Sequence, residues 1–439
     1  MIFSSLEFLI FWIFAFFLTR IEKFNIPIII GVVGLIFYSF QGYINSIILF
    51  YVFLIVSFFN YFKKFIFIFI FLILLPLIII KYSNFIINEL LILNLNLSYL
   101  NNFLIPPGLS FISFSAIALL LYLKNNHELN SINLSYLYLF PQLIAGPIVE
   151  PKSLIPQLKK IEKADIKNIF SGIFIFSVGI FLKVLLADSI GNYIDPIFSN
   201  LENSNFEIKI YCMFLFSQQI FFDFNGYTLM ALGIGKTLGF NLPENFNAPY
   251  LSRSITEFWK KWHITLSSWI KNYIYFPLGG SKNGNKKTYI NILLAMLISG
   301  FWHGAGFNFL IWGFFHGILI ILERSLNLNL KYSFDFIKIF YTYIIVSFLW
   351  LFFRLENITE FLFFFSNFST NFFFQIEFIL FMITMFSLNY FQKYLTMFNL
   401  LKIFKKLNLI FVVSLSLSVI FLCIIISKGS SQKFIYFNF

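Results

Sequence analysis

Charged residues are scarce in this chain of 439 residues: they make up 11% of the sequence, and hydrophobic residues make up 59%. A soluble globular domain covers its core with a charged exterior, so this composition excludes that class of protein. Cysteine is nearly absent as well. The two cysteines, Cys212 and Cys423, lie inside apolar runs, so no disulfide framework is expected.

The sequence also contains few histidines and no internal repeat. No two histidines have the four-residue spacing of a helical zinc site, and no cysteine lies near one, so we predict no metal centre. The two halves of the chain share no repeat and no corresponding pair of interrupted apolar segments, which many transporters have. This disfavours a non-catalytic lipid or solute transporter. The four histidines are His127, His263, His303 and His316.

Long apolar runs fill most of the chain. A helix needs about 20 mostly apolar residues to cross the core of a bilayer. We therefore predict an all-α, multi-pass membrane protein with about 11–13 transmembrane or re-entrant helices. The runs lie near 5–19, 26–40, 44–62, 65–80, 84–100, 109–123, 169–186, 210–222, 226–240, 289–301, 307–322, 336–353, 374–392 and 407–427.

The formal net charge of +12 comes from basic residues placed between apolar runs. Such residues collect in cytoplasmic loops, so the charge predicts orientation in the membrane and no nucleic-acid partner. The segments 150–167 and 241–287 are rich in lysine and are expected in the cytoplasm. The loop 191–208 has no lysine or arginine and is expected outside. Segment 2–19 has no basic start and no cleavage site, which predicts a retained first helix with its amino end outside.

One apolar run is interrupted. The run 136–149 contains Pro141, Gly146 and Pro147, which is typical of a re-entrant element rather than a complete span. Irregular backbone at membrane depth survives only where it lines protein or a wet cavity. This segment is therefore the first indication of a site.

Segment 254–271 (SITEFWKKWHITLSSWIK) has apolar residues at helical spacing and predicts one amphipathic helix. Ser254 and Glu257 fit a capping box at its start. Its three tryptophans and its lysines suit the membrane interface. His263 lies on the apolar face. Taken alone, its position favours a structural hydrogen bond to a neighbour over a functional role.

His303 follows an apolar run and lies among three glycines in GFWHGAG. Glycine permits close approach by another helix or by a ligand. An imidazole at membrane depth needs a partner or a function, which favours function over helix–helix contact. His316 lies thirteen residues later, which is roughly 220° away on a continuous helix, although a break at 304–306 would change that. Asp223 is expected to pair with Lys183 or Lys236, or to cap a helix.

An imidazole in this environment suits one kind of chemistry in particular. A sugar hydroxyl is a poor nucleophile near neutral pH, and a histidine can take its proton as it attacks a thioester. A thioester donor made in the cytoplasm would need a tunnel to reach a buried histidine. Acyl transfer is therefore one reaction that a buried histidine can catalyse.

Several stretches carry a family resemblance: 3–5 (FSS), 107–111 (PGLSF), 141–148 (PQLIAGPI), 183–196 (KVLLADSIGNYIDP), 222–280, 300–317 (GFWHGAGFNFLIWGFFHG) and 351–354 (LFFR). With them the chain resembles the membrane-bound O-acyltransferase family, in its bacterial branch for alginate and peptidoglycan O-acetylation. The resemblance covers roughly residues 1–360, and the last 80 residues contain ordinary apolar spans. We therefore divide the chain into three parts. These are N-terminal helices over 1–135, a catalytic core over 136–360 that contains the cytoplasmic segment 241–287, and C-terminal helices over 361–439.

The resemblance also implies a fold and a mechanism. The fold is a ring of tilted helices around a central funnel or tunnel. His303 matches the family's catalytic histidine and His263 its second histidine, on the cytoplasmic side of the tunnel. The donor, acetyl-CoA or a similar acyl thioester, would enter from the cytoplasm. The further residues predicted along the donor tunnel are Trp302, Trp259, Lys260, Lys261, Asn272, Tyr273, Asn308 and His316.

The expected function is O-acetylation of a cell-envelope polysaccharide, with peptidoglycan favoured, from the bacterial cytoplasmic (inner) membrane. The resemblance implies an extracytoplasmic partner of esterase fold that completes the transfer, and no bound cofactor. Two departures from the family pattern keep alternatives open. Leu229 and Asn272 stand where acetylases often carry aspartate. Leu229 also occurs in the branch that transfers D-alanine to teichoic acid from a carrier protein, and alginate or another exopolysaccharide is a further acceptor.

Overall fold

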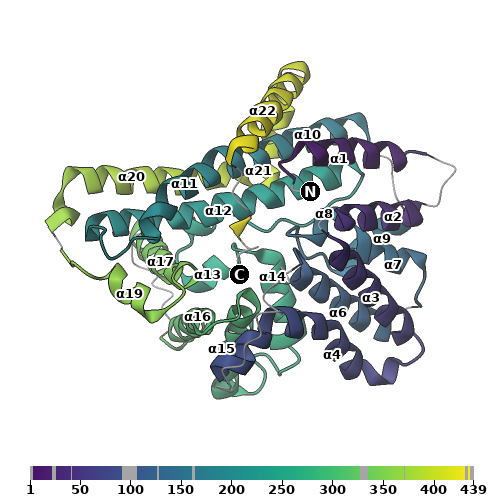
Figure 1. Ribbon diagram of the computed structural model, residues 1–439, viewed down its shortest axis with the longest axis horizontal. Helices are drawn as coiled ribbons and strands as arrows, with labels where there is room; N and C mark the ends of the chain where they lie inside the picture. The colour runs from purple at the N-terminus through teal and green to yellow at the C-terminus, as the bar shows by residue number, and fades with distance from the viewer. Residues whose placement is uncertain are drawn as a thin grey trace. The chain divides into compact units, whose positions relative to one another are not determined.

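The computed structural model describes residues 3–21, 26–40, 42–90, 106–125, 128–160, 164–326, 335–369, 371–430 and 434–435. These residues form helices and connecting turns, with no strand among them, which confirms the all-α prediction (Figure 1). They fall into two compact units. The first comprises Met1–Phe181, Tyr227–Pro243 and Asn408–Gly429, and the second comprises Leu182–Gly226, Glu244–Leu407 and Ser430–Phe439.

The first unit is built around a group of N-terminal helices in which α2 packs on α3 and α7, and α4 packs on α3 and α6. Its helices are α1 (Leu6–Leu18), α2 (Ile26–Ser39), α3 (Tyr43–Phe59), α4 (Ile66–Leu77), α6 (Leu109–Lys124), α7 (Ser131–Tyr138), α8 (Phe140–Leu143), α9 (Pro151–Lys159), α10 (Ile166–Phe181) and α22 (Leu409–Ser430). Its short helical turns are η1 (Lys63–Phe65), η2 (Ile78–Tyr82) and η3 (Phe85–Leu90).

The second unit carries the histidines singled out above, apart from His127, which lies outside the described residues. Its helices are α11 (Asp188–Phe198), α13 (Ile255–Trp259), α14 (Ile264–Ile270), α15 (Gly284–His303), α16 (Phe307–Ser325), α17 (Asp335–Leu349), α18 (Leu351–Arg354), α19 (Ile358–Phe364), α20 (Ile376–Phe391) and α21 (Met397–Lys406). Its short turns are η4 (Leu182–Ala187), η5 (Pro249–Leu251), η6 (Lys271–Tyr275), η7 (Asn371–Phe374) and η8 (Gln392–Leu395). Helix α12 (Phe206–Thr237) contributes residues to both units.

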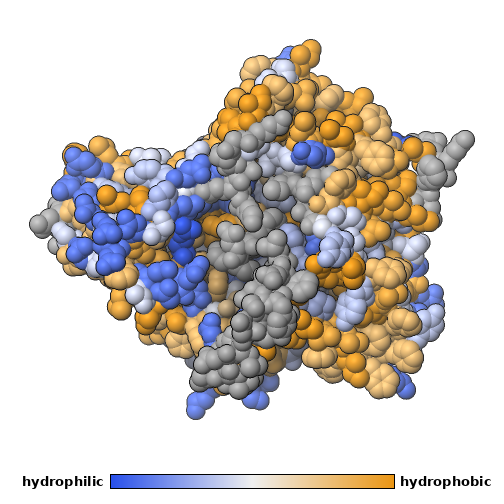
Figure 2. Space-filling view, in the orientation of Figure 1, coloured by the Kyte–Doolittle hydropathy of each residue, from blue (hydrophilic) through white to orange (hydrophobic). Residues whose placement is uncertain are grey.

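Five helical stretches among the described residues are long and apolar enough to cross a membrane: Lys63–Tyr82, Ile166–Phe198, Phe307–Ser325, Asp335–Arg354 and Leu409–Ser427. Large apolar side chains also remain on the surface of the first unit. Figure 2 shows them over α2, α3 and α4, where Phe67 is 82% exposed. Such a surface is stable against lipid and unfavourable in water. The chain is a multi-pass membrane protein.

Two boundaries differ from the sequence prediction. The runs 210–222 and 226–240 form the single helix α12, which Asp223 and Gly226 do not interrupt. The loop predicted to begin at residue 191 begins later, because helical residues continue from α10 through η4 and α11 to Phe198. In both places polar residues were taken as ends of helices, and in both they lie within one.

The interruption predicted in 136–149 is present. Helix α7 ends at Tyr138 and α8 begins at Phe140. The Tyr136 hydroxyl donates to the carbonyl of Val149 at 2.6 Å, and the Gln142 amide donates to the carbonyl of Tyr136 at 2.6 Å. A Cβ at Gly146 would lie 2.1 Å from the Pro141 carbonyl oxygen, so only glycine fits there. Side-chain hydrogen bonds thus satisfy backbone that the break leaves free.

Candidate active site

The site is built on the hairpin of α15 and α16, which pack along each other (Figure 1). Glycines permit the close approach. A Cβ at Gly300 would lie 2.2 Å from the Phe309 carbonyl oxygen, and a Cβ at Gly313 would lie 2.4 Å from the Met296 carbonyl oxygen. Helices that meet through small residues place side chains from both in one narrow space. The sequence GFWHGAGFNFLIWG therefore defines a hairpin as well as a motif.

His303 is the last residue of α15, and its side chain is buried. Its ring packs on three aromatic rings, with centroid distances of 4.8 Å to Trp302, 5.3 Å to Trp312 and 5.0 Å to Phe353. The helix ends here because the chain turns through extended backbone at Gly304, where a Cβ would lie 2.0 Å from the Phe309 ring. The imidazole is thus held at the turn of the hairpin.

The prediction of one continuous amphipathic helix over 254–271 is wrong, because the helix is interrupted in its middle. Helix α13 ends at Trp259, and α14 begins at Ile264. Between them His263 has left-handed backbone, with φ of 41°. Asn245 stabilises the break: its carbonyl accepts from the Ile264 N–H at 3.0 Å, and its side chain accepts from the Thr265 hydroxyl at 2.6 Å. These contacts outweigh the helical preference of the local sequence.

The break turns the His263 side chain into the protein, where it is fully buried. Its ring meets Phe224 edge-on at 4.7 Å and lies 6.1 Å from Trp302. Burial lowers the pKa of His263 to about 3, because the charged imidazolium loses its hydration. His263 is therefore neutral at physiological pH. Left-handed backbone at a non-glycine residue is strained and concentrates at functional sites.

His316 lies on α16 and is also fully buried. Its Nδ1 accepts a hydrogen bond from the Trp259 indole at 3.3 Å. Its ring lies 4.7 Å from Trp312, which in turn contacts His303 at 5.3 Å. The break between α15 and α16 therefore brings His316 and His303 to the same indole. One aromatic series runs His263–Trp302–His303–Trp312–His316.

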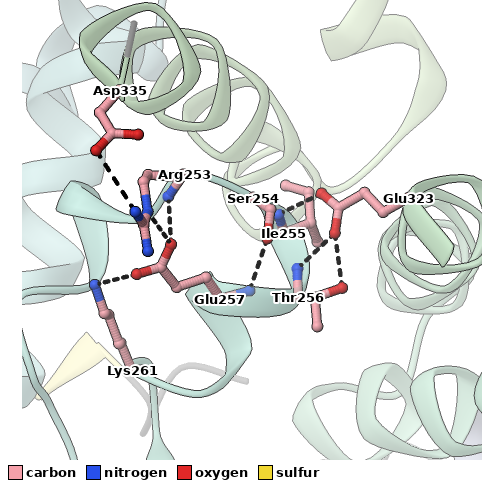
Figure 3. Close-up of polar contacts among 8 residues, drawn as sticks. All are labelled: Arg253, Ser254, Ile255, Thr256, Glu257, Lys261, Glu323 and Asp335. Atoms are coloured by element: carbon pink, nitrogen blue, oxygen red, sulfur yellow. Dashed lines mark hydrogen bonds and ion pairs between the residues drawn. The ribbon is translucent and has the colours of Figure 1, made fainter. Parts of the chain in front are cut away.

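A carboxylate from α16 fixes α13 in place. Glu323 accepts hydrogen bonds from the backbone N–H of Ile255 at 2.5 Å and of Thr256 at 2.9 Å, and from the Thr256 hydroxyl at 2.7 Å (Figure 3). These amides form the first turn of α13, where backbone donors have no partner within the helix. Because α13 carries Trp259, the contact also sets the position of the indole that bonds His316.

The start of α13 carries a second set of charges. The Ser254 hydroxyl accepts from the Glu257 N–H at 3.0 Å, which confirms the Ser254 half of the predicted capping box, whereas the Glu257 carboxylate accepts from the Arg253 N–H at 2.9 Å. The Glu257 carboxylate pairs with Lys261 at 2.8 Å and Arg253 at 3.2 Å, and Arg253 also reaches Asp335 at 3.5 Å (Figure 3). Partial burial raises the pKa of Glu257, but the hydrogen bonds from Lys261 and Arg253 outweigh it and lower the pKa to about 2.

The structure gathers some of the predicted tunnel residues and separates others. Trp302 and His316 belong to the aromatic series, and Trp259 bonds to His316 at its end. Lys260 is exposed, Lys261 is paired with Glu257, Asn272 is exposed, and Tyr273 packs on Trp269 at 5.1 Å. Asn308 donates to the carbonyl of Phe352 at 2.9 Å and so anchors the chain beside Phe353. None of these last five is in the series.

Asp223 pairs with Lys183, one of the two lysines considered, at 2.7 Å. Lys183 also pairs with Asp188 at 2.6 Å, and all three side chains are buried. The second Asp223 oxygen accepts from the Ile435 N–H at 2.7 Å. The cluster is a structural anchor in the second unit. Among the described residues no group of three potential ligands could hold a metal ion.

Three residues that contact the candidate site were not predicted from the sequence: Trp312, Phe353 and Glu323. Trp312 could have been found from its spacing, because it lies four residues before His316 and so shares its face of α16. The other two join the site only through the fold. A cavity of about 320 Å³ in the first unit, lined by residues such as Trp12, Phe16 and Ile173, contains none of the predicted site residues.

Comparison with known proteins identifies the class. A profile of the MBOAT family, membrane-bound O-acyltransferase, matches residues 130–366, which include His263, His303 and His316. That match covers more than half of the chain. The chain belongs to the membrane-bound O-acyltransferase family.

Three curated relatives show which kinds of acyltransferase the chain is similar to. The chain is 42% identical over 225 residues to a peptidoglycan O-acetyltransferase of Helicobacter pylori, covering 50% of this chain and 43% of that protein. It is 37% identical over 260 residues to a "probable alginate O-acetylase" of Pseudomonas putida (58% and 53%). It is 28% identical over 229 residues to a teichoic acid D-alanyltransferase of Bacillus subtilis (48% and 57%). The chain thus spans about half the length of these curated relatives.

Proposed function

We propose that the protein is a membrane O-acetyltransferase that passes an acetyl group from a thioester donor across the membrane for O-acetylation of a cell-envelope polysaccharide, with peptidoglycan as the final acceptor. The observation that carries the proposal is His303, a buried histidine at the turn of the α15–α16 hairpin, packed against Trp302, Trp312 and Phe353. Similarity to a relative named peptidoglycan O-acetyltransferase, at 42% identity, supports the choice of acceptor.

In this mechanism His303 acts as the general base. It takes the proton of an acceptor hydroxyl while the oxygen attacks the thioester carbonyl. The carbon–oxygen bond forms, the carbon–sulfur bond breaks, and the thiolate leaves with the proton that His303 had taken. Neutral His263, whose pKa is lowered by burial, orients the donor on the other side of Trp302.

The donor is acetyl-CoA or a similar acyl thioester that enters from the cytoplasm. The basic residues of segment 241–287 support entry of the donor from the cytoplasm, because such residues collect in cytoplasmic loops. Exposed Lys260 is available to attract an anionic donor, whereas Lys261 is already paired with Glu257. The acetyl group leaves on the outer side of the cytoplasmic (inner) membrane, where an esterase-fold partner completes the transfer.

D-alanyl transfer to teichoic acid is the second candidate. Leu229 favours it, as does the similarity to a teichoic acid D-alanyltransferase at 28% identity. Alginate or another exopolysaccharide is a further possible acceptor on the basis of the 37% relative. A non-catalytic transporter is disfavoured because it would not need three buried histidines in one aromatic series.

The test is a chemical analysis of the envelope in the parent strain, in a strain that lacks the gene and in that deletion strain after complementation. We expect base-released acetate from purified peptidoglycan to fall in the deletion strain and to return on complementation. D-alanine on teichoic acid and acetate on exopolysaccharide are measured in the same cultures. Unchanged peptidoglycan acetate with a loss in one of the other polymers would refute our choice of acceptor.

A further inference from the structure

The bond between Trp259 and His316 determines which nitrogen of His316 carries the proton. An indole Nε1–H can only donate, so Nδ1 of His316 must accept, at 3.3 Å. A neutral imidazole with a free lone pair on Nδ1 carries its hydrogen on Nε2. His316 therefore presents a donor from Nε2 and has no lone pair left with which to act as a base.

That donor is buried without an acceptor. The His316 side chain is fully buried, and its Nε2 has no hydrogen-bond partner among the described residues. The indole N–H of Trp312 is in the same condition, and the two rings lie 4.7 Å apart. A buried donor left unpaired is destabilising, so these two neighbouring donors are suited to a ligand that supplies an acceptor.

The chemistry of the ligand follows from the chemistry of the pair. Neither Nε2–H of His316 nor Nε1–H of Trp312 can accept a hydrogen bond in this state, so a hydroxyl or amine that must donate gains nothing there. A carbonyl oxygen, which only accepts, fits. The position agrees with the proposed reaction, because Trp312 also contacts His303 at 5.3 Å.

We propose that Trp312 and His316 bind the carbonyl oxygen of the acyl thioester and stabilise the negative charge that develops on it during transfer. This inference rests on the proposed function. The oxygen of the attacked carbonyl gains charge in the transition state, so donors aimed at it strengthen as the reaction proceeds. The hydrogen stays on Nε2 throughout, and His303 alone moves the proton. A neutral histidine can polarise a carbonyl in this way.

The test compares Trp312→Phe, His316→Ala and His316→Gln in purified protein within liposomes. Initial rates of acetyl transfer are measured over a range of acetyl-thioester concentrations and over pH. Trp262→Phe is the matched control. The Trp262 indole is also fully buried, with an N–H that lacks a partner among the described residues, but its ring packs on Phe246, Phe258 and Trp350.

We expect Trp312→Phe and His316→Ala each to lower kcat by about 10²-fold, the scale for loss of one such donor, with KM for the thioester nearly unchanged. His316→Gln should recover part of the loss, because its amide can still donate. The pH profile should keep its midpoints in all three variants, since neither donor titrates. Trp262→Phe should keep the wild-type kcat.

A second readout separates the role of a donor from that of packing. The carbonyl stretch of the bound 13C-labelled acetyl thioester should lie at lower frequency in wild type than in water, and should shift back in Trp312→Phe. Wild-type kcat in Trp312→Phe and His316→Ala, or an unshifted stretch in wild type, would overturn the assignment. So would a pH midpoint that moves in His316→Gln. Failure of the wild type to transfer acetyl would instead refute the proposed function.

Discussion

Substitution of Gly300 by alanine is the sharpest structural perturbation of the site. Gly300 lies on α15 three residues before His303, and faces the backbone of α16. An added Cβ would lie 2.2 Å from the Phe309 carbonyl oxygen and 3.3 Å from Gly313 Cα. Both contacts are with backbone, which cannot rotate away as a side chain can. The two helices must therefore separate.

The size of the separation sets the size of the effect. Restoring an ordinary contact of at least 3.4 Å moves the helices apart by about 1 Å. A misplacement of about 1 Å can lower the rate of a positioned reaction about 10²-fold. Overpacking of this kind destabilises a protein by about 1–3 kcal/mol, which need not prevent folding. We expect Gly300→Ala to accumulate in the membrane but to lose most acetyl transfer.

The assay measures base-released acetate from peptidoglycan in the complemented deletion strain, with the amount of protein in the membrane matched by immunoblot. Gly31→Ala is the control, because a Cβ at Gly31 in α2 would meet nothing within 4 Å. It should keep wild-type activity. Activity of Gly300→Ala within threefold of wild type at equal protein level would refute the claim that the backbone contact positions His303.

Two further predictions concern the charged groups. Lys183→Met leaves the buried carboxylates of Asp188 and Asp223 facing each other and should destabilise the protein by about 3–5 kcal/mol, whereas Asp223→Asn keeps the 2.6 Å pair and should do less. Thermal unfolding in detergent checks this, and equal losses in the two variants would contradict it. Glu257→Gln should lower stability by roughly 1 kcal/mol at pH 7, a small value because water screens this partly exposed pair with Lys261. Because the pKa of Glu257 is lowered to about 2, the difference in stability between wild type and Glu257→Gln is complete above about pH 5 and becomes smaller as the pH falls towards 2. A difference that grows as the pH falls would contradict this prediction.

Much of the helical content could be predicted from the sequence, because an apolar run long enough to cross a bilayer has few alternatives to a helix. The run near 307–322 corresponds to α16 (Phe307–Ser325), and the run near 407–427 to α22 (Leu409–Ser430). His303 could be singled out for the same reason, since a polar group in such a run needs an explanation. Its contact with Phe353, 50 residues away in the sequence, could not be identified before the fold was known.

The details of the site depend on contacts between distant residues. The break at His263 is held by Asn245, and helical periodicity carries no information about that pairing. Glu323 caps α13 from 68 residues away in the sequence. His316 joins His303 only because the hairpin folds back onto Trp312. These contacts cannot be predicted from local sequence patterns. They determine which of the predicted residues lie together in the candidate site.

The central claim is that His303 is the base for acyl transfer, and one measurement tests it most directly. The deletion strain is complemented with wild type or with His303→Ala at matched membrane levels, and base-released acetate from peptidoglycan is measured. Our account predicts that wild type restores the acetate and that His303→Ala leaves it at the level of the deletion strain. Full restoration by His303→Ala would contradict the account.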